Sequence, residues 1–496
     1  MISRISRSAT AFGWALFFLG FWIALTAAVN PAQFADSIEQ FNWAHGVEWG
    51  YWKHPPLPTW LMAGWLTLTG PSVYSTYSLA ALSLAGTAFF TWRVAQRLLG
   101  AQLGAVALLL WGLHLGFSWR AQLYNHNTVL VLTVSATVWA TLRAVDRGRL
   151  TDWMLAGLLA ATAALSKYQA VVPLAGILFA LWRTGVLRDA SQRRGVLLAL
   201  LVFCAACLPH ALWAVHNAFP SYRYFKESGG SLEGIARLSA WVAFLANQLR
   251  FHLPMLGAIG LALLWAPPAG APASAYDDED TPRPPGEARA WFWGLIGIPL
   301  ATLMLMLLAG GMKLQTYWGL QTLQFLPLLM AWKLGGLTRV LRFRSLLVAA
   351  LLIHAGSAVL YVRTLHQAES NQAMRSADRI YPAHALAAQA VASWRAETAC
   401  PLKYVVGPGF EAGLVSVYSG QYPAVLEAGD FGKSPWVDHD DLARSGAIVM
   451  SFAKPKPGED ALGAASMRLP GKREQDSPLR IYWHVQPPAE PCPEVH

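Results

Sequence analysis

Charged residues are scarce in this chain. Only 13% of its 496 residues are Asp, Glu, Lys or Arg, whereas a typical soluble domain contains about 25%. Hydrophobic residues make up 55% of the sequence, and long apolar runs recur from residue 11 to residue 363. This pattern excludes an ordinary soluble protein and predicts a polytopic membrane protein.

Several sequence signatures are also missing. The chain has no Walker loop, no Rossmann glycine fingerprint and no zinc-spaced set of Cys and His residues, which disfavours a nucleotide-binding or zinc-dependent protein. It has only four cysteines. Cys204 and Cys207 lie within an apolar run and are interpreted as packing residues. Cys400 and Cys492 bracket the C-terminal tail, where they either form a disulfide in an oxidising compartment or remain two free thiols.

The apolar runs predict about eleven membrane spans. The first follows Arg4 and Arg7 and is interpreted as a retained helix with a cytoplasmic N-terminus rather than a cleaved signal peptide. Residues 57–70 are apolar but short, and predict either a partial span or an interfacial helix. The expected spans are 11–29, 74–98, 101–119, 127–145, 151–166, 169–187, 196–215, 240–266, 291–310, 315–333 and 345–363.

Basic residues cluster in alternate loops between these spans, which the positive-inside rule assigns to the cytoplasm. This placement accounts for the net charge of +10 without nucleic-acid binding. The segment 267–290, with the acidic run Asp277–Asp280, falls on the same side and is interpreted as a flexible linker. The basic residues are Arg93 and Arg97, then Arg143, Arg147 and Arg149, then Arg183, Arg188, Arg193 and Arg194, and finally Arg339, Arg342 and Arg344.

The opposite side receives the first long loop, residues 30–57, and the tail, residues 364–496. The tail mixes short β-like runs with helical stretches and predicts a soluble α+β domain. The expected organisation is therefore an all-α membrane domain, residues 1–363, followed by a periplasmic domain, residues 364–496. The C-terminus would be periplasmic in a bacterial inner membrane.

The first long loop carries the strongest chemical signal. Asp36 and Glu39 lie three residues apart, which places them on one helix face. Lys53 and His54 follow, and a rigid Pro55-Pro56 pair presents them. Acidic groups that take a proton and cations that hold a phosphate would thus lie together at a membrane surface.

These residues resemble a known family. The stretch Trp49-Gly-Tyr-Trp-Lys-His-Pro-Pro-Leu57 after the first span is similar to the GT-C glycosyltransferases. The resemblance is closer to the bacterial branch related to protein O-mannosyltransferases and lipid A aminoarabinose transferase. It continues through Tyr124–Thr128 and Ser166–Tyr168, and more weakly through Lys313–Trp318 and Ser434-Pro-Trp436.

The resemblance implies a polyprenyl-phosphate-sugar donor and a periplasmic site with an acidic base. Asp36 matches the first acid of the family's Asp-Glu pair, but Ser37 follows it and the second acid comes only at Glu39. Lys53 and His54 stand where many relatives have an acidic residue. A metal site therefore does not carry over directly, and a divalent cation remains an open possibility.

Each candidate residue has a functional and a structural interpretation. Asp36 is either the general base or a helix cap, and Glu39 orients the acceptor or forms a salt bridge. Lys53, His54, Lys167 and Tyr168 are the candidates for binding the donor phosphate, against interfacial snorkelling of the lysines and a neutral His54. Candidates for substrate contacts, against a polar turn or interfacial loops, are Tyr51, Asn125, Asn127, Arg223 and Lys313.

The sequence thus predicts an inverting glycosyltransferase that moves a sugar from a polyprenyl-phosphate carrier to a periplasmic acceptor. The acceptor would be lipid A or lipopolysaccharide, another glycan or a protein. The alternatives are a transporter or flippase for lipid-linked sugars and a non-enzymatic membrane assembly protein. A flippase needs charged residues within its spans, whereas these candidates lie at span ends.

Overall fold

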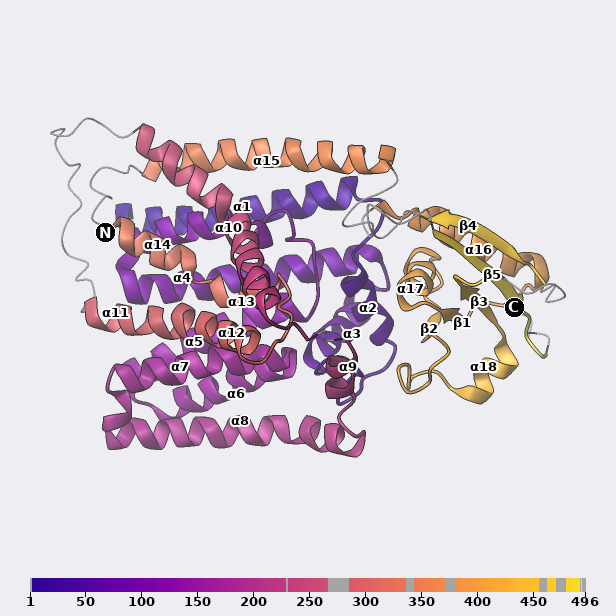
Figure 1. Ribbon diagram of the computed structural model, residues 1–496, viewed down its shortest axis with the longest axis horizontal. Helices are drawn as coiled ribbons and strands as arrows, with labels where there is room; N and C mark the ends of the chain where they lie inside the picture. Colours follow the sequence, from indigo (N-terminus) through magenta and orange to yellow (C-terminus); the bar gives the residue numbers. More distant parts are fainter. Residues whose placement is uncertain are drawn as a thin grey trace.

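The computed structural model describes residues 2–228, 231–265, 285–335, 343–371, 380–454, 462–469, 479–490 and 492. The predicted linker with the acidic run Asp277–Asp280 lies outside these residues, except for residues 285–290. The described residues form a bundle of helices with a small sheet domain at one end, as Figure 1 shows. The N-terminus lies at the far end of the bundle from the sheet.

Six of the described helices are long and apolar enough to cross a membrane. Their apolar side chains face neighbouring helices and, on the outside of the bundle, the expected lipid. The core of one half of the bundle includes α4 (Val73–Gly112), α5 (His126–Arg147), α6 (Leu150–Ser166), α7 (Val171–Arg183) and α14 (Leu326–Leu334), whose buried aliphatic and aromatic residues pack together. The six spans are Ala9–Val29, Val73–Gly112, His126–Arg147, Ala190–His216, Gly286–Leu308 and Phe343–Gln367.

The helices of the bundle that the structure describes follow in chain order. The bundle comprises α1 (Ile2–Val29), α2 (Ala35–Trp43), α3 (Leu57–Thr69), α4 (Val73–Gly112), η1 (Leu115–Phe117), α5 (His126–Arg147), α6 (Leu150–Ser166), η2 (Tyr168–Ala170), α7 (Val171–Arg183), η3 (Val186–Arg188), α8 (Ala190–His216), α9 (Pro220–Ser228), α10 (Ile235–Leu264), α11 (Pro285–Phe292), η4 (Trp293–Gly297), α12 (Ile298–Leu308), α13 (Trp318–Leu323), α14 (Leu326–Leu334) and α15 (Phe343–Asn371).

The long helix α4 is two helical segments joined at Gly100. This glycine has φ 82° and ψ 171°, a conformation that a side chain would strain. A Cβ added at Gly104 would lie 3.2 Å from the backbone nitrogen of Gln96. Residues eight apart in a straight helix are about 12 Å apart, so the chain turns back on itself here. The expected boundary between spans 74–98 and 101–119 is found at this turn.

The predicted span 315–333 is wrong as a single helix. The chain instead forms α13 and α14, of six and nine residues. Gly319 in α13 packs against the Gln248 side chain so closely that a Cβ would lie 1.9 Å from its Oε1. Residues 57–70 form α3, whose 13 residues extend about 20 Å, too short for a hydrocarbon core of about 30 Å.

Ion pairs join the turn within α4 to the ends of α5 and α11, at the end of the bundle remote from the sheet. Arg97 donates to both carboxylate oxygens of Asp146, at 2.5 and 2.6 Å, and pairs with Glu287 at 2.9 Å. Arg143 donates to Asp152 at 2.7 Å. Two of the arginines predicted to face the cytoplasm, Arg97 and Arg143, therefore join neighbouring helices here.

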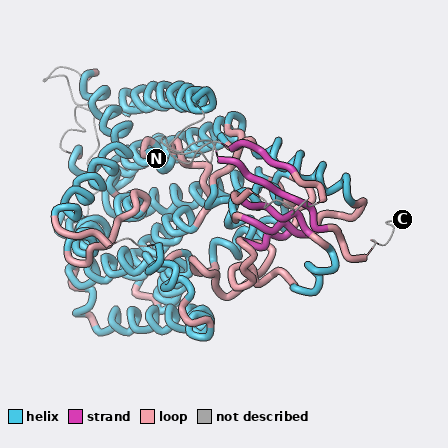
Figure 2. Tube along the Cα trace, turned by 45° about the vertical axis from the view of Figure 1, so that its right-hand side comes forward, coloured by secondary structure: helices cyan, strands magenta, loops and turns pink. Residues whose placement is uncertain are grey.

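The C-terminal domain is an α+β unit around a five-stranded sheet, seen in magenta in Figure 2. The strand order is β2-β1-β3-β5-β4; β1 pairs in parallel with β2 and β3, and β5 runs antiparallel to β3 and β4. Valine and isoleucine at alternate positions fill its core. Its elements are α16 (Ala383–Glu397), β1 (Tyr404–Gly407), α17 (Gly409–Tyr418), β2 (Ala424–Glu427), α18 (His439–Ser445), β3 (Ala447–Ser451), β4 (Ala465–Leu469) and β5 (Leu479–Gln486).

Helix α17 of this domain packs directly on α2 of the bundle. A Cβ added at Gly413 would lie 2.4 Å from Ile38 Cγ2, so only glycine permits this approach. Asn42 Nδ2 donates to the Gly409 carbonyl at 2.9 Å, and the Tyr422 hydroxyl donates to the Phe41 carbonyl at 2.9 Å. The domain therefore fixes the position of the first loop that follows α1.

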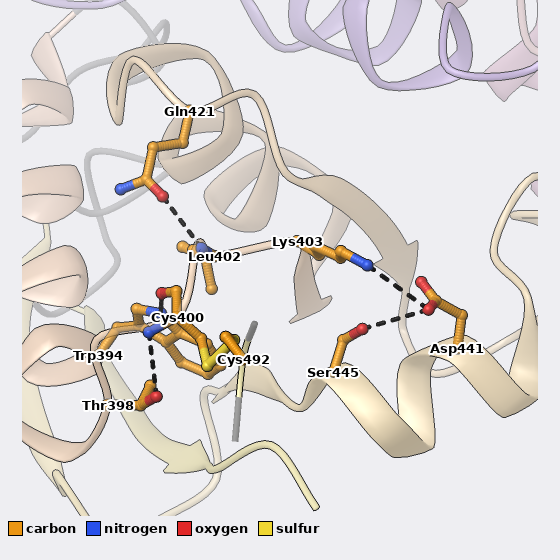
Figure 3. The surroundings of a disulfide bond; sticks show 9 residues. All are labelled: Trp394, Thr398, Cys400, Leu402, Lys403, Gln421, Asp441, Ser445 and Cys492. Carbon is orange, nitrogen blue, oxygen red and sulfur yellow. Dashed lines mark hydrogen bonds and ion pairs between the residues drawn. A yellow bond between two sulfur atoms is a disulfide. The ribbon is translucent and has the colours of Figure 1, made fainter. Parts of the chain in front are cut away.

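Cys400 and Cys492 form a disulfide with a Cα–Cα distance of 5.6 Å (Figure 3). Trp394 Nε1 donates to the Cys400 carbonyl at 2.7 Å, which ties the bond to α16. The bond closes a sequence separation of 92 residues, so it constrains the unfolded domain and should stabilise it by roughly 2–4 kcal/mol.

The disulfide gives a first testable prediction. Replacing both cysteines by serine should make the C-terminal domain of the full-length protein sensitive to protease at temperatures at which the unmodified protein resists. Limited proteolysis followed by mass spectrometry measures this. The Cys204→Ser/Cys207→Ser protein is the matched control and should behave as the wild type. Equal protease resistance with and without the disulfide would contradict the prediction.

Candidate active site

Helix α2 presents Asp36 and Glu39, two of the three carboxylates of the first loop. Asp36 lies in its first turn, where the helix dipole stabilises a negative charge, and Glu39 lies about one turn later. Phe34 is the residue that precedes the helix, and no side chain caps it. Asp36 therefore does not serve as the N-cap, and its side chain is exposed at the end of the bundle.

Asn125 holds the Asp36 carboxylate. Its Oδ1 accepts from the backbone N–H groups of Asn127 and Thr128, at 2.9 and 3.1 Å, and so caps α5. This fixes the amide orientation, and Nδ2 donates to Asp36 Oδ2 at 3.0 Å. One side chain thus starts a membrane helix and positions the carboxylate, which retains its second oxygen for a substrate.

The Lys167 ammonium is held by Asn127, in the same first turn of α5 as Asn125. Lys167 ends α6 and lies between the apolar helices α6 and η2–α7; its Nζ donates to Asn127 Oδ1 at 2.6 Å. Burial lowers the pKa of Lys167 to about 8, although the nearby Asp36 carboxylate acts in the opposite direction. Its partner is a neutral amide, so its charge is not cancelled by direct contact.

Lys53 is paired with the second carboxylate, Glu39. Burial raises the pKa of Glu39 to about 7, against the effect of Lys53. Burial alone would lower the pKa of Lys53, but Glu39 raises it above its ordinary value. Lys53 is therefore a cation that already has an anion, unlike Lys167.

The His54 ring lies against the His126 ring, with centroids 3.7 Å apart and the two planes tilted by 40°. Burial, with the neighbouring Lys167 and Lys53, lowers the pKa of His54 well below its ordinary value. At neutral pH His54 is uncharged and can contribute a hydrogen bond but not a positive charge.

The two candidate tyrosines are engaged by protein groups. The buried Tyr51 donates its hydroxyl to the Gly46 carbonyl at 2.6 Å and stacks on Trp43 at 5.0 Å. The Tyr168 hydroxyl contacts His210 Nε2 at 3.0 Å and Ser221 Oγ at 3.3 Å. His210 in turn contacts the Trp49 carbonyl at 2.7 Å. These contacts tie η2 and α8 to the first loop.

Arg223 and Lys313 lie at the surface rather than in the Asp36–Lys167 network. Arg223 is exposed on α9 and donates to the Asn217 carbonyl at 3.4 Å. Lys313 is exposed and follows Met312, which bridges to Ser231 beyond α9. Neither makes a described contact to Asp36, Glu39 or Lys167.

Two residues of the C-terminal domain reach the site without having been predicted. Glu427 acts electrostatically on both Glu39 and Lys53, and Lys433 lies 4.6 Å above the Trp52 ring. The Ser434-Pro-Trp436 motif marked this segment in the sequence, but its proximity to residue 52 depends on the tertiary fold.

No group of three or more His, Cys, Asp or Glu side chains is arranged to hold a metal ion within the part of the chain that the structure describes. The cations and amides around Asp36 suit an anionic substrate directly.

Comparison with known proteins bears on the fold of this chain. Residues 53–213 match the family model described as dolichyl-phosphate-mannose-protein mannosyltransferase. The fold is similar to the crystal structure of ArnT from Cupriavidus metallidurans bound to undecaprenyl phosphate, with a TM-score of 0.60 and 14% sequence identity. The match covers 95% of this chain and 98% of that chain. This chain has the GT-C glycosyltransferase fold. The predicted fold class, a helical membrane domain with a small C-terminal α+β domain, is thereby confirmed, whereas the predicted count of about eleven spans is not.

Curated relatives cover part of the chain. The lipid A galacturonosyltransferase RgtD of Rhizobium johnstonii is 23% identical over 242 residues, 47% of this chain and 48% of that protein. The undecaprenyl phosphate-alpha-4-amino-4-deoxy-L-arabinose arabinosyl transferase of Pseudomonas savastanoi is 28% identical over 250 residues, 48% of this chain and 45% of that protein. The chain thus spans about half the length of the curated relatives that it matches.

Proposed function

We propose that this GT-C protein is an inverting glycosyltransferase that moves a sugar from a polyprenyl-phosphate carrier to a lipid A or lipopolysaccharide acceptor outside the inner membrane. The observation that carries the proposal is one turn at the start of α5. Asn125 there holds the Asp36 carboxylate and Asn127 holds the Lys167 ammonium. A candidate base and a cation that makes no direct ion pair are therefore held close to each other.

Asp36 is the general base in this proposal. Its exposed carboxylate, oriented by Asn125, would take the proton of an acceptor hydroxyl as the oxygen attacks the anomeric carbon. The carbon–oxygen bond to the phosphate breaks on the opposite face, and the configuration inverts. General base catalysis of this kind contributes about 10²–10⁴-fold.

Lys167 would bind the donor phosphate and stabilise the charge that develops as it leaves. Lys53 is less suited to this role in the described state because Glu39 already pairs with it. The neutral His54 would add a hydrogen bond to the phosphate. Asn127, Tyr51 and Tyr168 would act by positioning their neighbours rather than by contacting the sugar.

The acceptor assignment is supported by the names of two relatives. RgtD is a lipid A galacturonosyltransferase and RgtA, 27% identical over 228 residues, is a lipopolysaccharide core galacturonosyltransferase, both from Rhizobium johnstonii. The arabinosyl transferase and ArnT carry undecaprenyl phosphate in their names or titles. Polyprenyl-phosphate sugars are accordingly the donors to test.

The stereochemistry of the product tests the mechanism. Purified protein supplied with a polyprenyl-phosphate sugar of defined anomeric configuration should give a glycosylated lipid of the opposite configuration, measured by proton NMR. Retention would remove Asp36 from the role of base in a single displacement. A flippase would move the donor across a vesicle membrane and leave the sugar–phosphate bond intact.

The pH dependence gives a further prediction. Because the pKa of Lys167 is about 8, its charge is present below that pH and is lost as the pH rises. kcat/KM for the donor, which reports the free enzyme, should fall about tenfold between pH 8.5 and pH 9.5.

Two variants isolate this effect. Lys167→Arg keeps its charge throughout and should show a flat profile from a lower plateau. Lys403→Arg, on the surface of the C-terminal domain, is the matched control and should keep the wild-type profile. A wild-type profile that stays flat to pH 9.5 would contradict the role given to Lys167.

A further inference from the structure

The Ser434-Pro-Trp436 motif builds a compact loop that the proposed chemistry does not use. Ser434 is buried, and its hydroxyl accepts from the Glu427 N–H at 2.9 Å. The Ser434 and Lys433 N–H groups donate to the Asp430 carbonyl at 3.2 and 3.1 Å. The residues 427–436 are thus held in one conformation by their own hydrogen bonds.

Trp436 anchors this loop to the bundle. A Cβ added at Gly46 would lie 2.9 Å from Trp436 Cβ, and the rings of Tyr51 and Trp436 have centroids 6.3 Å apart. The loop of the C-terminal domain therefore rests on the same first loop that presents Glu39 and Lys53.

Lys433 extends from this loop over the Trp52 ring, with its ammonium 4.6 Å from the centroid. Lys53 also approaches that ring, at 4.5 Å, but Glu39 neutralises it. Lys433 makes no ion pair with any residue that the structure describes. The aromatic ring orients the ammonium without cancelling its charge.

Helix α9 packs against the same Trp52 ring and carries further cations. Tyr224 packs edge-on against Trp52 at 5.1 Å. Arg223 and Lys226, three residues apart and therefore on one face, are both exposed. Glu227 lies four residues after Arg223, so one carboxylate also shares the face of that arginine. Tyr222 and Phe225 are 65% and 40% exposed, which suits a helix at a lipid headgroup layer.

We propose that Lys433, with Arg223 and Lys226, binds a phosphate group on the headgroup of the acceptor lipid and so determines acceptor specificity. The inference rests on the proposed function and adds residues of the C-terminal domain to its acceptor site. An in-line displacement needs donor phosphate and acceptor on opposite sides of the sugar. Asp36 is near groups of both sites, since it acts electrostatically on Lys167 and on Glu39, the partner of Lys53 beside Trp52.

A binding measurement tests this without depending on turnover. Full-length protein in nanodiscs is titrated with bisphosphorylated lipid A, with the same lipid after phosphatase treatment, and with phosphatidylglycerol, and binding is followed by native mass spectrometry. Lys433→Gln should weaken binding of the phosphorylated lipid A about tenfold, because one charge-assisted contact is lost. It should leave binding of the dephosphorylated lipid unchanged.

Two variants serve as controls. Lys433→Arg should restore most of the affinity, and Lys403→Gln, at another exposed lysine of the same domain, should bind as the wild type. Unchanged affinity of Lys433→Gln for phosphorylated lipid A would overturn the inference. So would an equal loss for phosphatidylglycerol, which would indicate a general anionic surface. Failure of the proposed function is a separate result, namely absence of sugar transfer to any acceptor by the wild type.

Discussion

Asp36→Asn is expected to reduce sugar transfer at least about a hundredfold, because it removes the proton acceptor while keeping the shape of the side chain. Asn125 Nδ2, which donates to Asp36 Oδ2 at 3.0 Å, can still donate to the amide oxygen of the variant. The protein should therefore fold and insert normally. The measurement is the initial rate of product formation by purified protein in detergent, with thermal unfolding recorded on the same samples.

Glu39→Gln is the matched comparison on the same helix. It removes the partner of Lys53 but not the proposed base, so its effect on the rate should be smaller. Near-normal turnover of Asp36→Asn would contradict the assignment. A larger loss for Glu39→Gln would exchange the roles of the two carboxylates, and the pKa of Glu39 near 7 would then suit it to accept a proton.

Lys167→Ala is expected to lower kcat/KM for the polyprenyl-phosphate donor by about tenfold to a hundredfold, the effect of losing one charge-assisted contact to the phosphate. The affinity for the acceptor should change little, because the proposed acceptor cations lie on α9 and in the C-terminal domain. Steady-state kinetics with each substrate varied in turn separates the two effects. Lys167→Arg should recover only part of the loss, since a planar guanidinium does not fit where a compact ammonium contacts Asn127 at 2.6 Å.

The same experiment has a clear contrary outcome. If Lys167→Ala binds and uses the donor as the wild type does, the lysine serves only to end α6 near the headgroups. The phosphate would then be held by Lys53 after separation from Glu39, and Glu39→Gln should in that case strengthen donor binding.

Much of the fold follows from the sequence because apolar length and loop charge act locally. The turn at Gly100, the long helices α5, α8 and α15, and the separate C-terminal sheet were all expected from such patterns. The single span predicted over residues 315–333 was wrong because of contacts with other helices. The polar residues Gln321 and Gln324 are buried there, and Gly319 fits against Gln248 of α10, so packing with other helices divides a run that composition alone would make one span.

The candidate site was only partly accessible from sequence. Spacing placed Asp36 and Glu39 on one helix, and the Asn125–Asn127 turn was recognised as polar. The pairing of Asn125 with Asp36 joins residues 89 positions apart, and that of Lys433 with Trp52 crosses from one domain to the other. Such contacts arise from packing between elements distant in the chain, for which no short motif exists. The ion pair between Lys53 and Glu39 likewise changed which lysine is best suited to the donor phosphate.

The most direct test of the central claim is the acceptor-dependent release of polyprenyl phosphate. Purified protein is incubated with a polyprenyl-phosphate sugar, with and without lipid A, and both lipids are quantified by mass spectrometry. The account predicts equal amounts of free polyprenyl phosphate and glycosylated lipid A, with both reduced at least about a hundredfold in Asp36→Asn. An intact sugar–phosphate bond after incubation of active, folded protein with a range of polyprenyl-phosphate sugars and lipopolysaccharide acceptors would contradict it.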